Sequence, residues 1–410
     1  MLNVDDALRK LSDLALPVLD SEAIPLSASN GRVVASIIEA PMDVPPFDAS
    51  AMDGYALHAH DLDLDLNQDQ GLTVVGESKA GHVYQDPLVP GTTVRIFTGA
   101  PIPNGTAAVV IQEDIERNGD QIRFRVSPEI GENIRSQGHD IAKMQLLAKS
   151  GDRLDAYKIS LLAACGVTEV TAVRRIRVAL FSTGDELTDP GSPLGPGQIY
   201  DANRTALREL VSERPVEVLD LGALPDDPQA ISRALQTAVE TADVVITSGG
   251  VSVGDADYVK DVVAQVGSLD FWKIALKPGK PLAVGRVGNA LFFGLPGNPV
   301  STIITYLLFV APTIDRLCGM PDSTPHQLPA ILQGTIEHHR GRREYVRGIF
   351  RINGNRITVS PNGDQSSNRL TSFANANCLI VVPERTDGIK PGSIVDILLL
   401  PTDRAHIWTG

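Results

Sequence analysis

VVITSGGVSVGDAD, residues 244–257, is the stretch that decides the fold of this 410-residue chain. The apolar run 244–246 predicts a buried strand, and the glycines and serines that follow predict a tight turn. A helix is expected to begin at Asp257. The chain therefore passes from strand through turn to helix, which is typical of a βαβ unit in which helices connect parallel strands.

The segments on both sides of this stretch repeat the same order. Strands that alternate with helices of about 10–15 residues predict a mainly parallel sheet in an α/β domain. The expected strands are 178–181, 216–221, 244–246, 271–275 and 291–294, and the expected helices are 203–213, 228–240, 257–266 and 299–317. Outside this domain, helices are expected at 3–16 and 154–164, and short strands between glycines and prolines at 72–126 and 331–400.

Composition excludes several classes of protein. The formal net charge of −14 at pH 7 argues against a nucleic-acid partner, because nucleic acid requires a basic surface. The widely spaced Cys165, Cys318 and Cys378 predict buried apolar thiols rather than a disulfide framework or a zinc site. No apolar run of membrane-spanning length and no signal-peptide pattern is recognised, which predicts a cytoplasmic protein without a membrane partner.

In an open parallel sheet, ligands bind beyond the carboxyl ends of the strands, and three loops are expected there. The first contains Asp185 and Glu186 beside Gly184. These carboxylates are interpreted either as contacts to a metal or substrate or as the capping acids of a helix-starting loop. Position alone leaves both interpretations open.

The second loop is the glycine-rich turn after residue 246. Small residues would let backbone N–H groups approach a phosphate, and the start of the next helix would favour its charge. Asp255 and Asp257 could then hold Mg²⁺ against the phosphate, since hard cations prefer carboxylate oxygen. The alternative is an ordinary glycine turn with capping acids.

The same turn contains the pattern Gly250-x-Ser252-x-Gly254, which also matches the nucleophile elbow of α/β hydrolases. A hydrolase needs a histidine placed later in the same domain. The downstream histidines all lie within or beyond a linker at 321–329, outside the α/β domain, which disfavours a hydrolase: His326, His338, His339 and His406. His338 and His339 are adjacent and would face opposite sides of a strand, so a shared metal is not expected.

The third loop holds a cluster of lysines, Lys273, Lys277 and Lys280. In so acidic a chain this cluster suits an oxyanion or pyrophosphate, although a solvated loop is the alternative. Shortly afterwards, Asn298 and Pro299 are expected to occupy the N-cap and first position of the long helix.

Several longer strings resemble the molybdopterin molybdotransferases, the family of MoeA-type proteins and the gephyrin E domain. They are PFDASAMDGYA (46–56), TGAPIP (98–103), ENIR (132–135), STGDEL (182–187), SGGVSVGDAD (248–257), KPGKP (277–281) and GLPGNP (294–299). Because these strings are distributed over nearly the whole chain, the resemblance is far more specific than a single glycine motif.

The resemblance implies a multidomain fold and a homodimer in which the N-terminal half of one subunit helps to line the site of the other. The implied parts are an N-terminal helix that packs with the α/β domain (1–26), a linker-type α/β module (27–45 and 144–172), a β-rich module (46–143), an α/β molybdopterin-binding domain (173–322) and a C-terminal β-barrel (323–410).

The implied activity is molybdenum cofactor biosynthesis. Molybdenum from molybdate enters adenylylated molybdopterin while Mg²⁺-dependent hydrolysis releases AMP. A contact with the adenylyltransferase that supplies the substrate is also expected. The alternatives from related proteins are an adenylyltransferase, which is generally a short single-domain protein, and a non-enzymatic scaffold like gephyrin.

The resemblance also assigns roles to residues. The implied catalytic residues are Asp53, Glu186, Asp226, Asp257, Lys273 and Lys277, with Glu186 and Asp257 as metal ligands. The implied substrate-binding residues are Thr98, Arg135, Asp140, Ser248, Gly249, Gly250, Ser252, Gly254, Lys280, Pro296 and Pro299. The implied molybdate ligands are Arg342, Arg347 and Ser367, of which Ser367 departs from the usual position of the family's serine pair by one residue.

Overall fold

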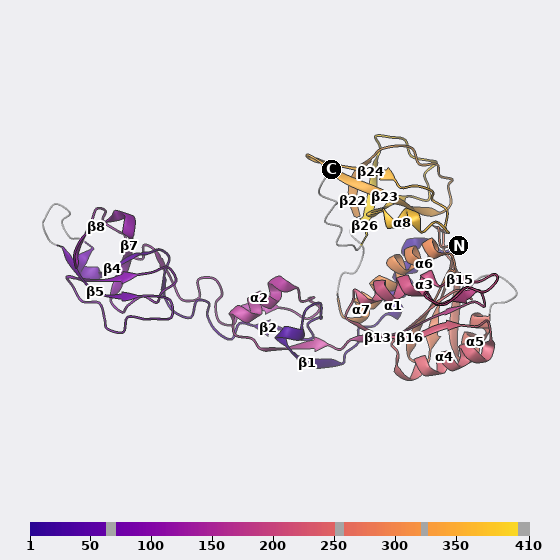
Figure 1. Ribbon diagram of the computed structural model, residues 1–410, viewed down its shortest axis with the longest axis horizontal. Coiled ribbons are helices and arrows are strands. Elements are labelled where there is room, and N and C mark those ends of the chain that lie inside the picture. Colours follow the sequence, from indigo (N-terminus) through magenta and orange to yellow (C-terminus); the bar gives the residue numbers. More distant parts are fainter. Residues whose placement is uncertain (63–70, 251–257, 321–326, 401–410) are drawn as a thin grey trace.

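The computed structural model describes residues 1–62, 71–250, 258–320 and 327–400. The molecule is elongated, with a β-rich module at one end, a small middle module, and an α/β domain at the other end with a β-barrel beside it (Figure 1). The N-terminus lies with the α/β domain, because α1 (Val4–Leu14) packs against its long helix. The chain therefore runs out to the far module and returns.

The α/β domain is built on a six-stranded sheet in the order β16-β13-β17-β21-β20-β18. The first four are parallel: β16 (Val216–Leu224), β13 (Ile176–Thr183), β17 (Val244–Ser248) and β21 (Ala290–Leu295). Every residue of β17 and β21 is buried, as expected for parallel strands covered on both faces. The predicted α/β domain with a mainly parallel sheet is confirmed.

Helices cover both faces of this sheet. On one face, α4 (Pro228–Thr241) and α5 (Tyr258–Val266) bury side chains such as Ile231, Leu235 and Val263. On the other, α3 (Ala202–Ser212), α1 and the long helix form a larger core. In α1 the buried residues Val4, Ala7 and Leu11 recur at helical spacing, so one stripe faces the core.

The sequence pattern missed one strand of this sheet. The antiparallel edge consists of β20 (Pro281–Val287) and β18 (Gly267–Lys273), but no strand was expected at 281–287. Gly285 and Arg286 interrupt the apolar run. Gly285 is required because a Cβ there would lie 2.0 Å from the carbonyl oxygen of Ser268 on the neighbouring strand.

The long helix is continuous from Pro299 to Leu317 but changes its winding. It consists of α6 (Pro299–Thr305), a π-helical segment η4 (Tyr306–Val310) and α7 (Ala311–Leu317). The π turn lies just before Pro312, which has no N–H for the usual i to i−4 hydrogen bond. By length and composition this run could cross a membrane, so the expectation that no such run exists was wrong, but 72% of its apolar window is buried in the protein core.

The N-terminal half forms two modules. In the middle module β1 (Ser21–Pro25) pairs with β12 (Glu169–Val173), β2 (Ile38–Glu39) pairs with β11 (Leu146–Ala148), and α2 (Ala156–Ala164) packs beside them. The structure therefore divides the predicted segment 1–26, because α1 packs on the α/β domain while β1 belongs to the middle module.

The β-rich module is a six-stranded sheet in the order β7-β4-β6-β5-β9-β8. Its strands are β4 (Gly54–His58), β5 (Leu72–Ser78), β6 (Thr92–Ile96), β7 (Thr106–Ile111), β8 (Ile115–Asn118) and β9 (Gln121–Phe124). The chain enters it through β3 (Ala49–Ser50) and leaves through β10 (Ile134–Arg135), and these two short strands pair with each other.

The C-terminal domain is a closed barrel, as predicted. Its ring runs β23-β24-β22-β26-β25 and closes by pairing of β25 with β23. The strands are β22 (Gln327–Leu332), β23 (Arg343–Asn353), β24 (Arg356–Pro361), β25 (Cys378–Val382) and β26 (Ile394–Leu399). Strand β19 (Leu276–Lys277) of the α/β domain pairs with the start of β23, so the two domains share one ladder.

The three cysteines are free and buried, which confirms their interpretation as core residues. Burial raises the pKa of the thiols of Cys318 and Cys378 to about 12. Neither is therefore suited to act as a nucleophile.

Candidate active site

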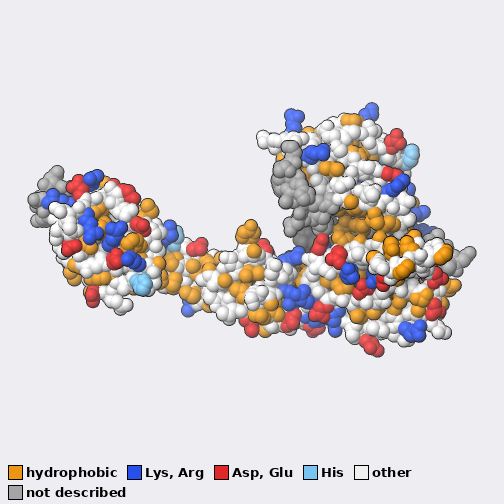
Figure 2. Space-filling model, in the orientation of Figure 1, with side chains coloured by type: hydrophobic (Ala, Val, Ile, Leu, Met, Phe, Trp, Pro, Cys, Tyr) orange, Lys and Arg blue, Asp and Glu red, His pale blue; other side chains and the backbone are white. Residues whose placement is uncertain are grey.

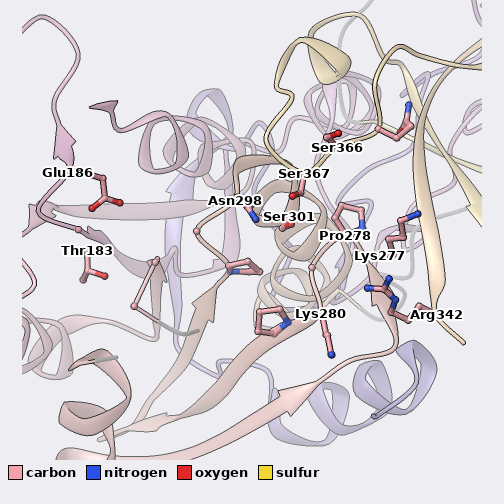
Figure 3. Close-up of a pocket in the computed structure, with 18 of the residues that line it drawn as sticks. Thr183, Glu186, Lys277, Pro278, Lys280, Asn298, Ser301, Arg342, Ser366 and Ser367 are labelled. Atoms are coloured by element: carbon pink, nitrogen blue, oxygen red, sulfur yellow. The ribbon is translucent and has the colours of Figure 1, made fainter. Parts of the chain in front are cut away.

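A cleft of about 720 Å³ lies between the carboxyl ends of the parallel strands and one side of the barrel (Figure 3). All three loops predicted for this edge reach it, because parallel strands end at the same edge of a sheet. The lining residues are Thr183, Gly184, Glu186, Asp226, Gly249, Gly250, Lys277, Pro278, Gly279, Lys280, Pro281, Pro296, Gly297, Asn298, Ser301, Arg342, Gln365, Ser366 and Ser367.

The structure brings many of the predicted site residues together here. Those that line the cleft are Glu186, Asp226, Gly249, Gly250, Lys277, Lys280, Pro296, Arg342 and Ser367. Lys273, Ser248, Pro299 and Arg347 are not among the lining residues. Ser252, Gly254, Asp255 and Asp257 lie outside the described residues.

The floor of the cleft is the glycine turn after β17. Gly249 and Gly250 have φ of +90° and +64°, which favours glycine, and a Cβ on Gly250 would lie 2.5 Å from Val259 Cγ2. Ser248 is buried and does not line the cleft. Its hydroxyl accepts a hydrogen bond of 2.8 Å from Asn203 Nδ2, which holds the start of the glycine turn. The same amide donates to the carbonyl of Gly297, so one asparagine on α3 ties two loops of the cleft together.

One wall of the cleft is acidic. Asp185 and Glu186 follow β13, and Asp226 follows the neighbouring β16. Burial raises the pKa of Asp226, and the charges of Asp185 and Glu186 raise it further. Thr183 adds a buried hydroxyl for which the described residues provide no hydrogen-bond partner. This wall thus holds carboxylates that repel one another, a setting that a cation would relieve.

The opposite wall is cationic (Figure 3). Within the described part of the chain, Lys280 and Arg342 form no ion pair, whereas Lys277 Nζ lies 2.9 Å from Glu344 Oε1. Unpaired cations in a chain of charge −14 are suited to an anionic ligand. Lys273, by contrast, is exposed at the end of β18 and contributes nothing to this wall.

The barrel supplies the third side through the loop that contains Ser366 and Ser367. Arg347 lies underneath this loop rather than on the surface of the cleft, which corrects its expected position as a direct ligand. Its buried guanidinium donates to Ser372 Oγ and to the carbonyls of Asp364 and Ser366, and burial lowers its pKa to about 10. Arg347 therefore holds the loop in place.

The remaining predicted residues lie in and beside the β-rich module, away from the cleft in the same chain (Figure 1). Asp53 Oδ1 accepts hydrogen bonds of 2.7 Å from both the backbone N–H and the hydroxyl of Thr98. These bonds lower the pKa of Asp53, which therefore stays ionised. Arg135 lies on β10, and Asp140 follows it, bonded through its backbone to Val44.

Comparisons with known proteins account for this combination of parts. Residues 2–166 match the MoeA N-terminal region (domain I and II), 179–316 a probable molybdopterin binding domain, and 329–400 the MoeA C-terminal region (domain IV). A molybdopterin molybdenumtransferase of Haemophilus influenzae is 41% identical over 97% of this chain and 98% of its own length. The chain belongs to the molybdopterin molybdenumtransferase family.

Other family members agree. A molybdopterin molybdenumtransferase of Nostoc is 36% identical over 93% of this chain and 89% of its own length. The crystal structure of a molybdopterin biosynthesis MoeA protein from Pyrococcus horikoshii superimposes with a TM-score of 0.83 at 29% identity, covering 98% of this chain and all of that one. The chain is thus a transferase enzyme of molybdenum cofactor biosynthesis, in preference to a short adenylyltransferase or a non-enzymatic scaffold.

Sequence reasoning missed some residues that line the cleft of this family member. Asn298 occupies the N-cap of α6 as expected, but its side chain makes no capping bond and lines the cleft instead. Its place in the GLPGNP string was a usable signal. Ser301, Gln365 and Ser366 gave none, because only the packing of the barrel against α6 turns them toward the same cavity.

Proposed function

We propose that this enzyme inserts molybdenum from molybdate into adenylylated molybdopterin, with Mg²⁺-dependent cleavage of the adenylate and release of AMP. The observation that carries the proposal is one cleft that is lined by crowded carboxylates on one wall and by Lys277, Lys280 and Arg342 on the other. A substrate with a phosphoanhydride, together with a metal oxyanion, requires both kinds of wall.

The acidic wall fits Mg²⁺. Glu186 and Asp226 offer hard oxygen ligands, and the pKa of Asp226 is raised by burial and then by the charges of Asp185 and Glu186. Among the described residues, the Thr183 hydroxyl has no hydrogen-bond partner. Among the described residues no three such side chains converge on one point, so substrate oxygens and Asp257 would have to complete the shell. When bound, Mg²⁺ would polarise the anhydride and offset charge on the leaving AMP.

The chain's own residues bind and orient the substrates. Lys277, Lys280 and Arg342 attract the phosphate and oxyanion, while the Ser367 hydroxyl and the backbone of Gly249 and Gly250 offer short-range contacts. The dithiolene sulfurs of the substrate are the ligands that molybdenum receives. No protein nucleophile is therefore needed, in agreement with the buried state of the three thiols.

We further propose that two subunits combine to complete each site. Thr98 donates two hydrogen bonds to Asp53, and both residues are remote from the cleft of their own chain. The cleft that they serve would therefore belong to a second copy. The middle module offers a surface for such pairing, since it exposes large apolar side chains that a dimer could cover. These are Ile37, Met144, Leu146 and Tyr157.

The substrate would come from an adenylyltransferase, and we expect a direct contact with that enzyme. We place the protein in the cytoplasm on the basis of its free thiols, which suit a reducing compartment.

The test is direct. Purified protein is mixed with adenylylated molybdopterin, molybdate and Mg²⁺, and AMP release is measured together with activation of an apo-molybdoenzyme. We expect both, and we expect a metal chelator to abolish both. If no AMP above background appears, the proposal fails. If AMP appears without molybdenum transfer, the site cleaves adenylates but the insertion step is wrong.

A further inference from the structure

Among the cleft cations that the structure describes, Lys277 differs because it is held by the barrel. Lys277 and Glu344 stand opposite each other where β19 pairs with β23, and Lys277 Nζ lies 2.9 Å from Glu344 Oε1. Lys280 and Arg342 on the same wall form no ion pair within the described ranges. The contact therefore ties a lysine of the α/β domain to a carboxylate of another domain.

Glu344 is itself held by a second side chain. Its other oxygen, Oε2, lies 2.8 Å from Nδ1 of His338, and Glu344 and His338 are 4% and 7% exposed. A buried carboxylate is costly unless its oxygens are paired, and here each oxygen has one partner. Within the described ranges, His338 Nε2 is buried without a hydrogen-bond partner, so the polar contact that this ring makes there is the one to Glu344.

This arrangement limits the motion of the lysine without consuming its donors. A lysine side chain is flexible, and an ion pair of fixed geometry removes much of its rotamer freedom before a ligand arrives. An ammonium group has three N–H donors, so an ion pair with one carboxylate oxygen leaves it able to donate to an anion as well. Lys277 lines the cleft, and its side chain is 43% exposed.

The same strand also fixes the opposite side of the oxyanion site. Arg347, three residues beyond Glu344 on β23, donates to the backbone carbonyls of Asp364 and Ser366. The side chain of Gln365 is bound in both directions to the backbone of Arg347. One barrel strand thus positions both the lysine and the serine loop, which explains how a separate domain can matter to a site on the sheet edge.

We propose that Glu344, held by His338, is a positioning residue that fixes Lys277 for binding the oxyanion substrate. This rests on the function proposed above, in which Lys277 binds an oxyanion. Two effects oppose each other in this arrangement: Glu344 pre-organises the lysine, but its negative charge also repels an anion. Pre-organisation of Lys277 dominates over repulsion of the anion. If so, removing the charge of Glu344 weakens molybdate binding; if repulsion dominated, it would tighten binding.

The experiment uses the full-length protein and the variant Glu344→Gln. Initial rates are measured against molybdate concentration at saturating adenylylated molybdopterin and Mg²⁺, and molybdate binding is measured separately by calorimetry. We expect the KM and Kd for molybdate to rise about tenfold while kcat changes less than about twofold, because only binding of the oxyanion is affected. His338→Gln should raise both about threefold, since it loosens Glu344 without removing it.

Arg343→Gln is the matched control. Arg343 precedes Glu344 on β23 and pairs with Asp5 and Glu384 at the same domain junction, but it does not line the cleft. It should leave the KM for molybdate unchanged. An equal rise in Arg343→Gln would mean that the junction matters only as structure, and this would overturn the proposal.

Lys277→Met separates this proposal from the proposed function. If Lys277→Met leaves molybdate affinity unchanged, the oxyanion role of Lys277 fails, and the proposed function must change with it. If Lys277→Met weakens binding but Glu344→Gln has no effect or tightens it, only the positioning role is wrong. The double variant should bind molybdate no more weakly than Lys277→Met alone, because a positioning residue acts through the lysine; additive losses would contradict this.

Discussion

Asp226 and Asp53 are the same residue type in opposite environments. Asp226 stands in the cleft, where burial and the neighbouring charges of Asp185 and Glu186 raise its pKa. Asp53 stands at the edge of the β-rich module, where the N–H and hydroxyl of Thr98 lower its pKa. The environment of Asp226 therefore disfavours its charged form, whereas the hydrogen bonds from Thr98 stabilise the charged form of Asp53.

The difference teaches how the site is assembled. Among the described residues, the cleft brings together carboxylates that repel one another, and Lys280 and Arg342 form no ion pair there. Asp53 is instead held by two hydrogen bonds from Thr98, and neither residue is among those that line the cleft. The proposed shared site would join these two regions across a symmetric dimer, the cleft from one subunit and Asp53 from the other.

The largest effect, on the rate of AMP release, is expected when either Asp53 or the cleft residue Lys277 is replaced. Asp53→Ala and Lys277→Met should each reduce AMP release at least about a hundredfold, since each removes one half of every site. Co-refolding or co-expression of equal amounts should restore about a quarter of wild-type activity, because half of the dimers are mixed and one of their two sites is intact.

Each variant mixed with itself is the control for this complementation. If the mixture stays as inactive as the separate variants, the site is not shared between subunits. If Asp53→Ala alone retains normal turnover, the resemblance has misassigned the N-terminal residues.

The second prediction tests the role of the acidic wall through the variant Asp226→Asn. Asp226→Asn should lower turnover on the order of a hundredfold and raise the Mg²⁺ concentration required, because a metal ligand is lost. Its Tm should not fall, since removing one of the crowded charges relieves repulsion. The readouts are AMP release against Mg²⁺ concentration and a thermal melt.

Glu217→Gln serves as the control for Asp226→Asn, since Glu217 lies near the opposite end of β16 and is exposed. A marked loss of Tm in Asp226→Asn would show that this carboxylate stabilises the fold. The comparison with Asp53 would then be wrong.

A smaller effect is expected from Asn203, which supports the cleft from behind. Asn203→Ala leaves the Ser248 hydroxyl and the Gly297 carbonyl without their donor, so it should cost about 1–2 kcal/mol of unfolding free energy. The KM for adenylylated molybdopterin should rise about fivefold as the glycine turn loosens. Denaturant unfolding measures the free energy, and steady-state kinetics measure the KM. The control is Arg208→Ala, since Arg208 is exposed on the same helix.

The smallest effect concerns the pH dependence of stability at Asp53. Its pKa is depressed in the folded protein, so the carboxylate stabilises the fold above its unfolded pKa, near 4, and loses this contribution as the pH falls through the folded pKa. At pH 7, Asp53→Asn should lower the Tm by about a degree or two. The difference from wild type should shrink to nothing in acid, and a difference that stays constant down to pH 2 would refute this assignment.

The order of strands and helices in the α/β domain was predictable because burial on both faces leaves a clear apolar pattern in β17 and β21. Strand β20, next to the edge strand β18, was missed because Gly285 and Arg286 break that pattern. The close approach that requires Gly285 exists only once β18 lies beside it. The chemistry of the cleft was visible in its lysines and carboxylates. The supporting roles of Arg347 and Asn203 were not, since their partners are distant in sequence.

The sequence by itself determined the family, the parallel sheet and the residue types of the cleft, because these depend on local periodicity and on short strings whose chemistry is explicit. Only the tertiary structure decided which of those residues meet. It placed Asp53 and Thr98 away from the cleft of their own chain, brought the barrel loop against α6, and paired Lys277 with Glu344 across two domains. Contacts between distant segments depend on how separately folded units pack, and no local pattern records that packing.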